Sequence, residues 1–378
     1  MIHIGYNKPF LTGKETDYIK EAVQSGKISG DGIFTKKCHA FFEETFPFHK
    51  CLLTTSCTDA LEMTAILLDI KQGDEVIAPS YTFVSTVNPF ILRGAKVIFL
   101  DSAKENPNIN IDAIEAAITP KTKAIIAVHY AGIACDMDKI MAIAKKHKLY
   151  VVEDAAQAID SYYKGKALGS FGELSAFSFH ETKNIISGEG GMLVVNDNSF
   201  SKRAEIIREK GTNRSAFFRG EIDKYGWVDI GSSFLPSDII AAFLYAQLEN
   251  IEKIQKRRKE IWENYFTGLS ELQNLGIQLP FIPKFATNNG HIFYLVCRSI
   301  DERTQLMKYL KGNGIHAVFH YQSLHKSEFY RKTTITEPDL PEANRYTDCL
   351  LRLPLYYELE NSQIDYIVEH IKLFFTKK

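Results

Sequence analysis

In Val151-Val-Glu-Asp-Ala-Ala-Gln157, two apolar residues run directly into two carboxylates. An apolar run of this kind is typical of a strand that is buried on both faces of an α/β sheet. Ligands bind such sheets beyond the carboxyl ends of the strands, which is where Asp154 would lie. A helix cap followed by a solvated Glu153 explains this stretch equally well on its own, so the surrounding sequence must decide.

The sequence around this stretch alternates between short β-rich runs and helical patterns. We expect strands at residues 50–54, 75–78, 96–100, 124–128, 150–152, 175–179 and 191–195, and helices at 58–70 and 136–147. Strands that alternate with helices predict a mostly parallel sheet with helices on both faces. The predicted fold class is therefore α/β, with Asp154 at the ligand-binding edge of the sheet.

The pattern changes after about residue 240. We expect a helix over residues 239–265, strands at 292–297 and 316–319, a helix after Asp301 and a final helix at 362–375. A chain of 378 residues is also too long for one typical core. The sequence therefore predicts a large domain at residues 1–240 and a small C-terminal α+β domain at residues 241–378.

Composition argues against several classes of partner. The net charge of -1 gives no overall field that favours nucleic acid or an anionic membrane. No run reaches the ~20 apolar residues of a membrane helix, and the N-terminus lacks the apolar run of a signal peptide. The six cysteines show neither a C-x-x-C pair nor zinc spacing. We therefore expect a cytoplasmic protein with free thiols, no metal, no nucleic-acid partner and no membrane contact.

Two loops next to predicted strands carry residue types that suit a phosphorylated cofactor. Thr54-Thr-Ser-Cys-Thr-Asp59 precedes a predicted helix, whose free N–H groups and positive dipole end bind phosphate, although simple N-capping explains it as well. Ser178-Phe-His-Glu-Thr-Lys-Asn184 places Lys183 on the loop after another strand. A lysine in a pocket, with a lowered pKa, can attack a carbonyl, whereas most lysines are solvated surface residues.

The acidic stretch and the absent motifs narrow the choice of cofactor. Pyridoxal phosphate (PLP) needs a carboxylate that keeps its pyridine nitrogen protonated, and Asp154 suits this role, with Gln157 placed to contact the 3-oxygen of the ring. A zinc-protease H-E-x-x-H motif would need histidine at position 184, which is Asn184. Neither the P-loop pattern nor a G-x-G-x-x-G in the first βα unit occurs, and Ser187-Gly-Glu-Gly-Gly191 is a weak phosphate loop.

Taken in order and spacing, these motifs resemble those of the DegT/DnrJ/EryC1/StrS family of sugar aminotransferases, which have PLP fold type I. The resemblance covers essentially the whole chain. It includes Ser29-Gly-Asp-Gly32, Pro79-Ser-Tyr-Thr-Phe83, Val128-His-Tyr-Ala-Gly132, the stretches 207–214 and 229–233, His320-Tyr321 and Leu353-Pro354. Within the family, the stretches at 128–132, 178–184, 207–214 and 229–233 resemble those of TDP-4-keto-6-deoxyglucose 4-transaminases.

The resemblance implies a role for individual residues. Lys183 holds PLP covalently and is the catalytic residue, and Asp154 pairs with the pyridine nitrogen. The other implied cofactor contacts are Gln157 at the 3-oxygen, Tyr81 stacked on the ring, and Ser56, Cys57 and Ser178 at the phosphate. Ser233, in Gly231-Ser-Ser-Phe234, takes the place of the usual Asn that reaches the neighbouring subunit's phosphate. The implied substrate contacts are Tyr130, Asn213, Arg214, Arg219, His320, Tyr321 and His325.

The resemblance also implies an activity and an assembly. The expected reaction is transamination of a TDP-linked 4-keto-6-deoxyhexose to the 4-amino sugar, with glutamate as donor, in the synthesis of a surface glycan such as the O-antigen of lipopolysaccharide. The expected assembly is a homodimer with composite active sites. A 3-aminotransferase acting on a 3-keto sugar remains open, as does a PLP- or sugar-binding protein without turnover. A PLP-dependent sugar dehydratase is disfavoured, because those relatives replace the lysine with histidine.

Overall fold

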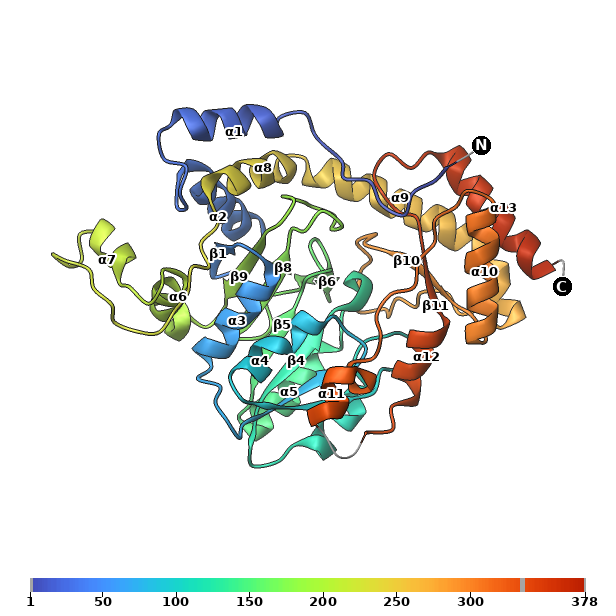
Figure 1. Cartoon of the computed structure of the whole chain (residues 1–378), viewed down its shortest axis with the longest axis horizontal. Coiled ribbons are helices and arrows are strands. Elements are labelled where there is room, and N and C mark those ends of the chain that lie inside the picture. Colours follow the sequence, from blue (N-terminus) through green and yellow to red (C-terminus); the bar gives the residue numbers. More distant parts are fainter. Residues whose placement is uncertain (1–2, 334–336, 377–378) are drawn as a thin grey trace.

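The computed structural model describes residues 3–333 and 337–376 and is built around a seven-stranded sheet with the order β1-β9-β8-β5-β4-β2-β3 (Figure 1). The strands are β1 (Lys50–Thr54), β2 (Glu75–Pro79), β3 (Lys96–Leu100), β4 (Thr122–Val128), β5 (Tyr150–Asp154), β8 (Leu174–Ser178) and β9 (Gly191–Val195). Strand β9 is antiparallel to both β1 and β8, and the other pairings are parallel. The predicted α/β class is confirmed, and so is the position of Asp154 at a strand end.

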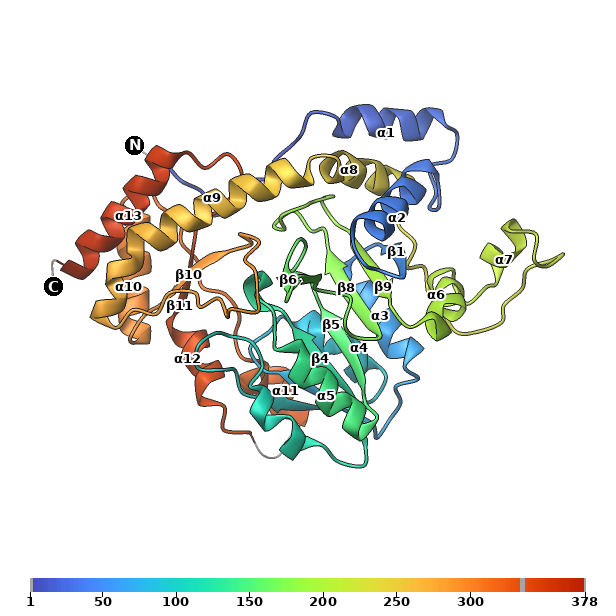
Figure 2. The ribbon, with the colours of Figure 1, turned by 180° about the vertical axis from the view of Figure 1, so that it is seen from behind.

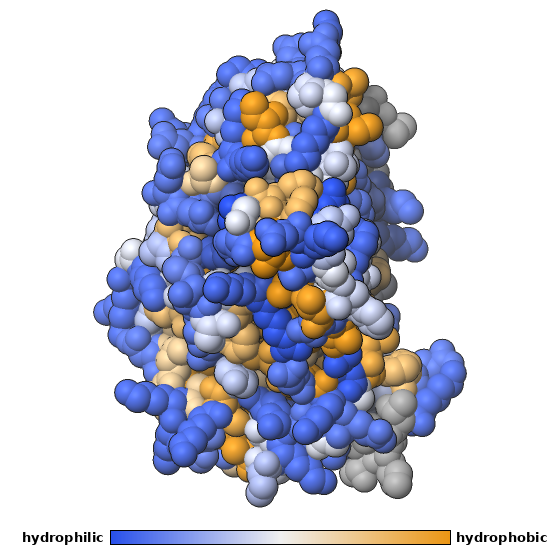
Figure 3. Space-filling model, turned by 90° about the vertical axis from the view of Figure 1, so that its left-hand side faces the viewer, coloured by the Kyte–Doolittle hydropathy of each residue, from blue (hydrophilic) through white to orange (hydrophobic). Residues whose placement is uncertain are grey.

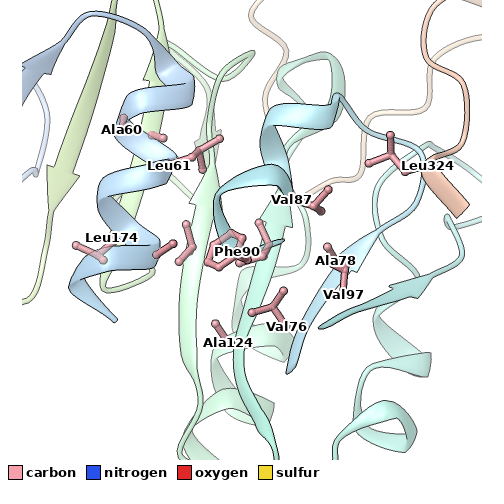
Figure 4. Close-up of a cluster of buried hydrophobic side chains, with 14 of the residues drawn as sticks. Ala60, Leu61, Val76, Ala78, Val87, Phe90, Val97, Ala124, Leu174 and Leu324 are labelled. Atoms are coloured by element: carbon pink, nitrogen blue, oxygen red, sulfur yellow. The ribbon is translucent and has the colours of Figure 1, made fainter. Parts of the chain in front are cut away.

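Helices bury both faces of this sheet, because neighbouring strand residues point to opposite sides. Val76 and Ala78 pack in the core under α3 (Cys57–Leu67) and α4 (Asn88–Leu92), as Figure 4 shows. Ile77, between them, belongs to the core on the other face. That face is covered by α2 (Ile33–Thr45), α5 (Met137–His147) and α8 (Asp238–Leu248), with α1 (Glu15–Gln24) packed on α8.

A smaller unit follows at the C-terminal end (Figure 2). Its helices are α9 (Ile251–Leu269), α10 (Ile300–Gly312), α11 (Glu328–Thr333), α12 (Pro341–Cys349) and α13 (Asn361–Thr376), and its strands are β10 (Phe293–Val296) and β11 (Leu350–Leu353). The long helix α9 changes core partner along its length, since Ile254 packs with the large sheet and Ile261 with the small unit. This change falls later in the chain than the predicted boundary at residue 240.

Two of the elements predicted after about residue 240 are wrong. The expected strand at 316–319 is reduced to one isolated bridge between Val318 and Arg352, because the next carbonyl, that of Phe319, accepts from the Arg352 side chain rather than from a neighbouring strand. The expected helix at 239–265 is two helices, α8 and α9. They separate at Asn250, whose side-chain amide donates to the carbonyl of Ala246 at 3.0 Å and so competes with the backbone.

Residues 209–233, here called the arm, project away from the sheet and carry the short helix α7 (Arg214–Phe218) beyond α6 (Ser201–Arg208) (Figures 1 and 2). Large apolar side chains of the arm are exposed, with Trp227 at 81% and Phe218 at 67%. Among the described residues, no helix is long and apolar enough to cross a membrane. That part of the chain also has no group of three or more side chains that would hold a metal ion.

Candidate active site

A cavity of about 610 Å³ lies at the carboxyl ends of β5 and β8. Asp154 is the last residue of β5, Ser178 is the last residue of β8, and Lys183 follows on the next loop. The side chains that line it come from both units and include Tyr6, Ser56, Cys57, Thr58, Phe83, Gln157, His291, His320, Tyr321 and Arg352. The cavity therefore joins residues that are separated by most of the chain.

Asp154 is a buried carboxylate without a cationic partner in the described part of the chain. Its Oδ2 accepts from the hydroxyl of Thr86 at 2.7 Å, and its Oδ1 accepts from the backbone N–H of Ala156 at 3.2 Å. Thr86 is fully buried and in turn contacts the hydroxyl of Thr82 at 2.7 Å, so its position is fixed. A buried charge is normally paired, so this carboxylate fits a positively charged group of a ligand.

Lys183 lines the same cavity with its side chain half-buried. Burial lowers the pKa of its amine below the usual 10.5, although Cys57 and Asp154 oppose the shift. The backbone N–H of Lys183 donates to the carbonyl of His180 at 2.9 Å, which closes a turn after β8. A lowered pKa increases the neutral fraction of the amine, and the neutral amine is the form that attacks a carbonyl.

The N-terminus of α3 forms another wall of the cavity. Ser56 caps this helix by accepting from the N–H of Asp59 at 3.0 Å. The first N–H groups of a helix have no partner within it, and here Cys57 and Thr58 face the cavity. Gly191 in β9 permits this arrangement, because a Cβ at that position would lie 2.3 Å from the backbone nitrogen of Cys57. The wall fits an anionic group such as a phosphate.

A chain of polar contacts crosses the cavity from Gln157. Its Oε1 accepts from the N–H of Ala131 at 2.7 Å, and its Nε2 donates to the hydroxyl of Tyr321 at 2.8 Å. The ring of Tyr321 stacks on His320 with centroids 3.6 Å apart, and Nδ1 of His320 lies 2.7 Å from the hydroxyl of Tyr130. Burial, together with the charges of Arg352 and Lys183, lowers the pKa of His320 well below 6.5, so this imidazole is neutral at pH 7.

Several residues expected at the site lie elsewhere. Tyr81 is buried behind the cavity wall against Tyr130, Tyr321 and Tyr346, and Phe83 takes the lining position instead. The turn after β2 directs Tyr81 into the core, and Phe83, two residues later, faces the cavity. Tyr130 is likewise a core residue, and only its hydroxyl reaches the site, through His320.

The remaining expected residues do not line the cavity of this chain. His325 is buried and its Nδ1 lies 2.7 Å from the hydroxyl of Ser80, which suits a structural histidine. The others belong to the arm: Asn213, Arg214, Arg219 and Ser233. The arm that carries these four residues projects outward from the sheet (Figure 1).

Three lining or supporting residues escaped the sequence prediction. Phe83 belongs to the motif Pro79-Ser-Tyr-Thr-Phe83, but the resemblance implied Tyr81 as the cofactor contact. Thr86 and Arg352 belong to no recognised spacing, and only the fold brings them to Asp154 and the cavity. Long-range contacts of this kind leave no local sequence pattern, so the sequence alone could not have found them.

The fold and this cavity define a class of protein: a PLP-dependent aminotransferase. The chain belongs to the DegT/DnrJ/EryC1/StrS aminotransferase family, whose model matches residues 9–372. It is 34% identical over 386 residues to the GDP-perosamine synthase of Escherichia coli O157:H7, with 100% of both chains covered. It is 32% identical over 378 residues to the spore coat polysaccharide biosynthesis protein SpsC of Bacillus subtilis (strain 168), covering 97% of this chain and 96% of that one.

Solved structures agree with this assignment. The PLP form of the putative sugar aminotransferase Spr1654 from Streptococcus pneumoniae superposes with a TM-score of 0.92 at 26% identity, covering 100% of this chain and 99% of that one. DesV of S. venezuelae gives a TM-score of 0.90 at 27% identity, covering 99% of both chains. The protein is therefore an enzyme, a sugar aminotransferase whose cofactor is PLP. The cavity fits this cofactor, since it offers an unpaired buried carboxylate, a lysine and a phosphate-binding helix end.

Proposed function

We propose that this enzyme transaminates a TDP-linked 4-keto-6-deoxyhexose at C4, with glutamate as the amino donor. The observation that carries the transamination is one cavity in which the buried carboxylate of Asp154 lies with a lysine of lowered pKa, Lys183. The TDP-linked sugar and the C4 position rest on the sequence resemblance alone. When bound, PLP supplies the electron sink that lets a carbon next to nitrogen lose its proton. The side chains around it supply binding, orientation and proton transfer.

Asp154 and Lys183 have the central roles in the proposed reaction. The carboxylate of Asp154, held by Thr86 and Ala156, keeps the pyridine nitrogen protonated. The Nζ atom of Lys183 would hold the cofactor and, when free, would take a proton from one carbon and return it to another. Burial lowers the pKa of this amine below its usual 10.5 and so increases the neutral fraction of the free amine, which is the form that a base requires.

The other lining residues position the substrates. The N-terminus of α3, with Ser56, Cys57 and Ser178, holds the phosphate of the cofactor. Gln157 contacts the 3-oxygen of the ring, and Phe83 covers a ring face. Tyr321 and the neutral His320 contact the sugar as hydrogen-bonding groups without net charge, which suits a neutral hexose.

The arm supports a homodimer with composite sites. The arm carries the exposed side chains of Phe218 and Trp227. It lies on the left of Figure 1, and Figure 3, which shows the molecule from that side, has hydrophobic patches in a mostly hydrophilic surface. A second copy of the chain that covers this side would bury them. The same contact would bring Ser233 to the partner's cofactor phosphate, and Asn213, Arg214 and Arg219 to the diphosphate of the partner's substrate.

Mixing two inactive variants tests this assembly. Lys183→Ala removes the lysine, and Ser233→Asp places a negative charge where a phosphate is expected. If the sites are composite, a mixture of the two chains regains part of the activity, because the hybrid has one intact site. A monomer by light scattering that remains active at the same concentration would rule the proposal out.

The biological setting is also part of the proposal: a cytoplasmic enzyme of surface-glycan synthesis. The name of the Bacillus subtilis relative refers to a coat polysaccharide, which supports this setting. The six cysteines are free thiols in the structure, as a reducing compartment would keep them.

The decisive experiment supplies the purified enzyme with PLP, glutamate and keto-sugar nucleotides, and locates the new C–N bond by NMR. We expect nitrogen at C4 of the TDP-linked 4-keto-6-deoxyhexose. The GDP-linked sugar is included because one relative is a GDP-perosamine synthase. Nitrogen at C3 would overturn the position of amination alone, and no product from any keto sugar would contradict the proposed substrate class.

A further inference from the structure

Arg352 presents a cation to the cavity that no carboxylate of the described residues neutralises. It stands in β11, at the edge of the small unit, and its side chain is half-buried. Its Nη2 and Nε donate to the carbonyl of Phe319 at 2.9 and 3.3 Å, and its guanidinium lies over the ring of Tyr6, 4.7 Å from the centroid. These contacts fix the group in place without neutralising its charge.

The contacts also leave one edge of the guanidinium open. Nε and one proton of Nη2 are taken by Phe319, whereas Nη1 has no hydrogen-bond partner in the part of the chain that the structure describes. The edge formed by Nη1 and Nη2 therefore remains for a ligand. Two parallel N–H donors on that edge match the two oxygens of a carboxylate.

The charges around the cavity single out this arginine. Lys183 is committed to the cofactor, and Asp154 to the pyridine nitrogen. His320 is neutral, and burial together with the charge of Lys183 also lowers the pKa of His291 well below 6.5. Arg352 is thus the permanent positive charge among the described lining residues that the cofactor does not use.

The chemistry of the amino donor supplies an anion for this position. The donor carries its α-carboxylate on the same carbon that must give its proton to Lys183, so this carboxylate enters the cavity with the reacting carbon. The diphosphate of a sugar nucleotide is attached across the hexose ring from C4 and lies farther from that carbon. We propose that Arg352 binds the α-carboxylate of the amino donor; this rests on the proposed transaminase function.

The two half-reactions separate this role from a general one. The first half-reaction consumes glutamate and releases 2-oxoglutarate, and the second consumes the keto sugar and releases the amino sugar. Replacing Arg352 with Gln should lower kcat/KM of the glutamate half-reaction by about 100-fold, since one partner of a desolvated charge pair is lost. The keto-sugar half-reaction should change by less than about 3-fold, because the neutral sugar does not use the charge.

Rescue and a matched control strengthen the test. Arg352→Lys keeps the charge but loses the paired donors, and should recover part of the glutamate rate. Arg298→Gln removes an exposed arginine that pairs with Glu302 at the start of α10, and should leave both half-reactions unchanged. Equal losses in both half-reactions of Arg352→Gln, or an unchanged glutamate half-reaction, would overturn the proposal.

A binding measurement gives a readout that does not depend on turnover. Glutarate has two carboxylates and no amine, so it occupies the donor site without reacting. Calorimetry on the holoenzyme should show weaker glutarate binding in Arg352→Gln and unchanged binding of TDP. Weaker TDP binding with unchanged glutarate binding would assign Arg352 to the diphosphate and overturn the proposal. If the wild type carries out the glutamate half-reaction but accepts no keto sugar, the proposed substrate fails while the role of Arg352 is still measured.

Discussion

Glu153 and Asp154 are neighbouring carboxylates at the end of one strand, yet their surroundings are opposite. Glu153 faces the α5 side of the sheet and is fully buried. It accepts from the N–H groups of Gly169, Phe171 and Gly172 at 2.7 to 2.8 Å and lies 3.0 Å from Nε2 of His129. Asp154 faces the cavity, where it accepts from one hydroxyl and one amide and forms no ion pair within the described residues.

The difference distinguishes a structural carboxylate from a functional one. Glu153 has all its acceptors used by the protein and joins β5 to the 169–172 turn. Gly172 makes this turn possible, because a Cβ there would lie 2.4 Å from the carbonyl oxygen of Val151. Asp154 keeps acceptor capacity for a ligand, because its described hydrogen-bond partners are one hydroxyl and one amide. Glu153 and Asp154 therefore have different roles because successive residues of a strand point to opposite faces of the sheet.

Within this pair of carboxylates, the largest expected effect is that of Asp154→Asn. The amide keeps the size of the carboxylate but cannot hold the pyridine nitrogen protonated, so turnover should fall by about 1000-fold, the upper range for losing one electrostatic group at a reacting centre. The fold should be unaffected. Steady-state kinetics and circular dichroism check this, and near-normal kinetics would remove Asp154 from the mechanism.

Glu153→Gln should give the reverse pattern. The amide cannot accept all the hydrogen bonds that the carboxylate accepts, so the free energy of unfolding should fall by about 2–3 kcal/mol, as for hydrogen bonds to a charged group. Activity per folded molecule should stay within a few-fold of wild type. Urea unfolding followed by fluorescence measures the first quantity. A 1000-fold loss of turnover in a stably folded Glu153→Gln enzyme would abolish the distinction.

The contact between Glu153 and His129 predicts a smaller, pH-dependent effect on the stability of the fold. Burial alone would lower the pKa of His129, but its contacts with Cys135 and Glu153 raise it to about 10. A raised pKa means that the stabilisation is complete below pH 6.5 and is lost as the pH rises through about 10. Wild type should therefore lose more stability than His129→Gln between pH 7 and 10. Parallel urea midpoints for the two proteins across this range would contradict the charged pair.

The smallest effect is expected in the arm. Arg219 is exposed and already pairs with Glu205 at 2.9 Å and Glu221 at 2.6 Å, unlike Arg352. Arg219→Ala should change the free energy of unfolding by less than about 1 kcal/mol, because exposed ion pairs contribute little. If the arm contacts the partner's substrate, KM for the sugar nucleotide should rise while kcat is maintained. An unchanged KM would remove Arg219 from the substrate site.

The fold could be predicted from the sequence because each strand is a short apolar run with a clear beginning and end. The strands at 96–100 and 191–195 were predicted to the residue. The prediction failed where tertiary contacts determine the backbone conformation, as at Val318, which forms a single bridge with Arg352. Helix α9 follows α8 without a strong breaker, so the boundary at Asn250 depended on one side-chain hydrogen bond.

The candidate site likewise contains residues that local motifs predict and residues that only the assembled fold brings to the cavity. Asp154, Gln157, Ser178 and Lys183 stand on two local motifs at strand ends, and the structure brings all four to one cavity. Tyr81 and Phe83 differ only in which way a tight turn directs them, and no periodicity fixes that. Arg352 comes from a strand of the other unit, so its presence at the cavity is a property of the assembled fold.

The most direct test of the account is to identify the lysine that carries the cofactor. The holoenzyme should be yellow, and borohydride reduction should fix PLP to a single peptide. We expect mass spectrometry to find the modification on Lys183, and Lys183→Ala to lose both the stable adduct and turnover. A reduced cofactor on any other lysine, or full turnover by Lys183→Ala, would contradict the central claim.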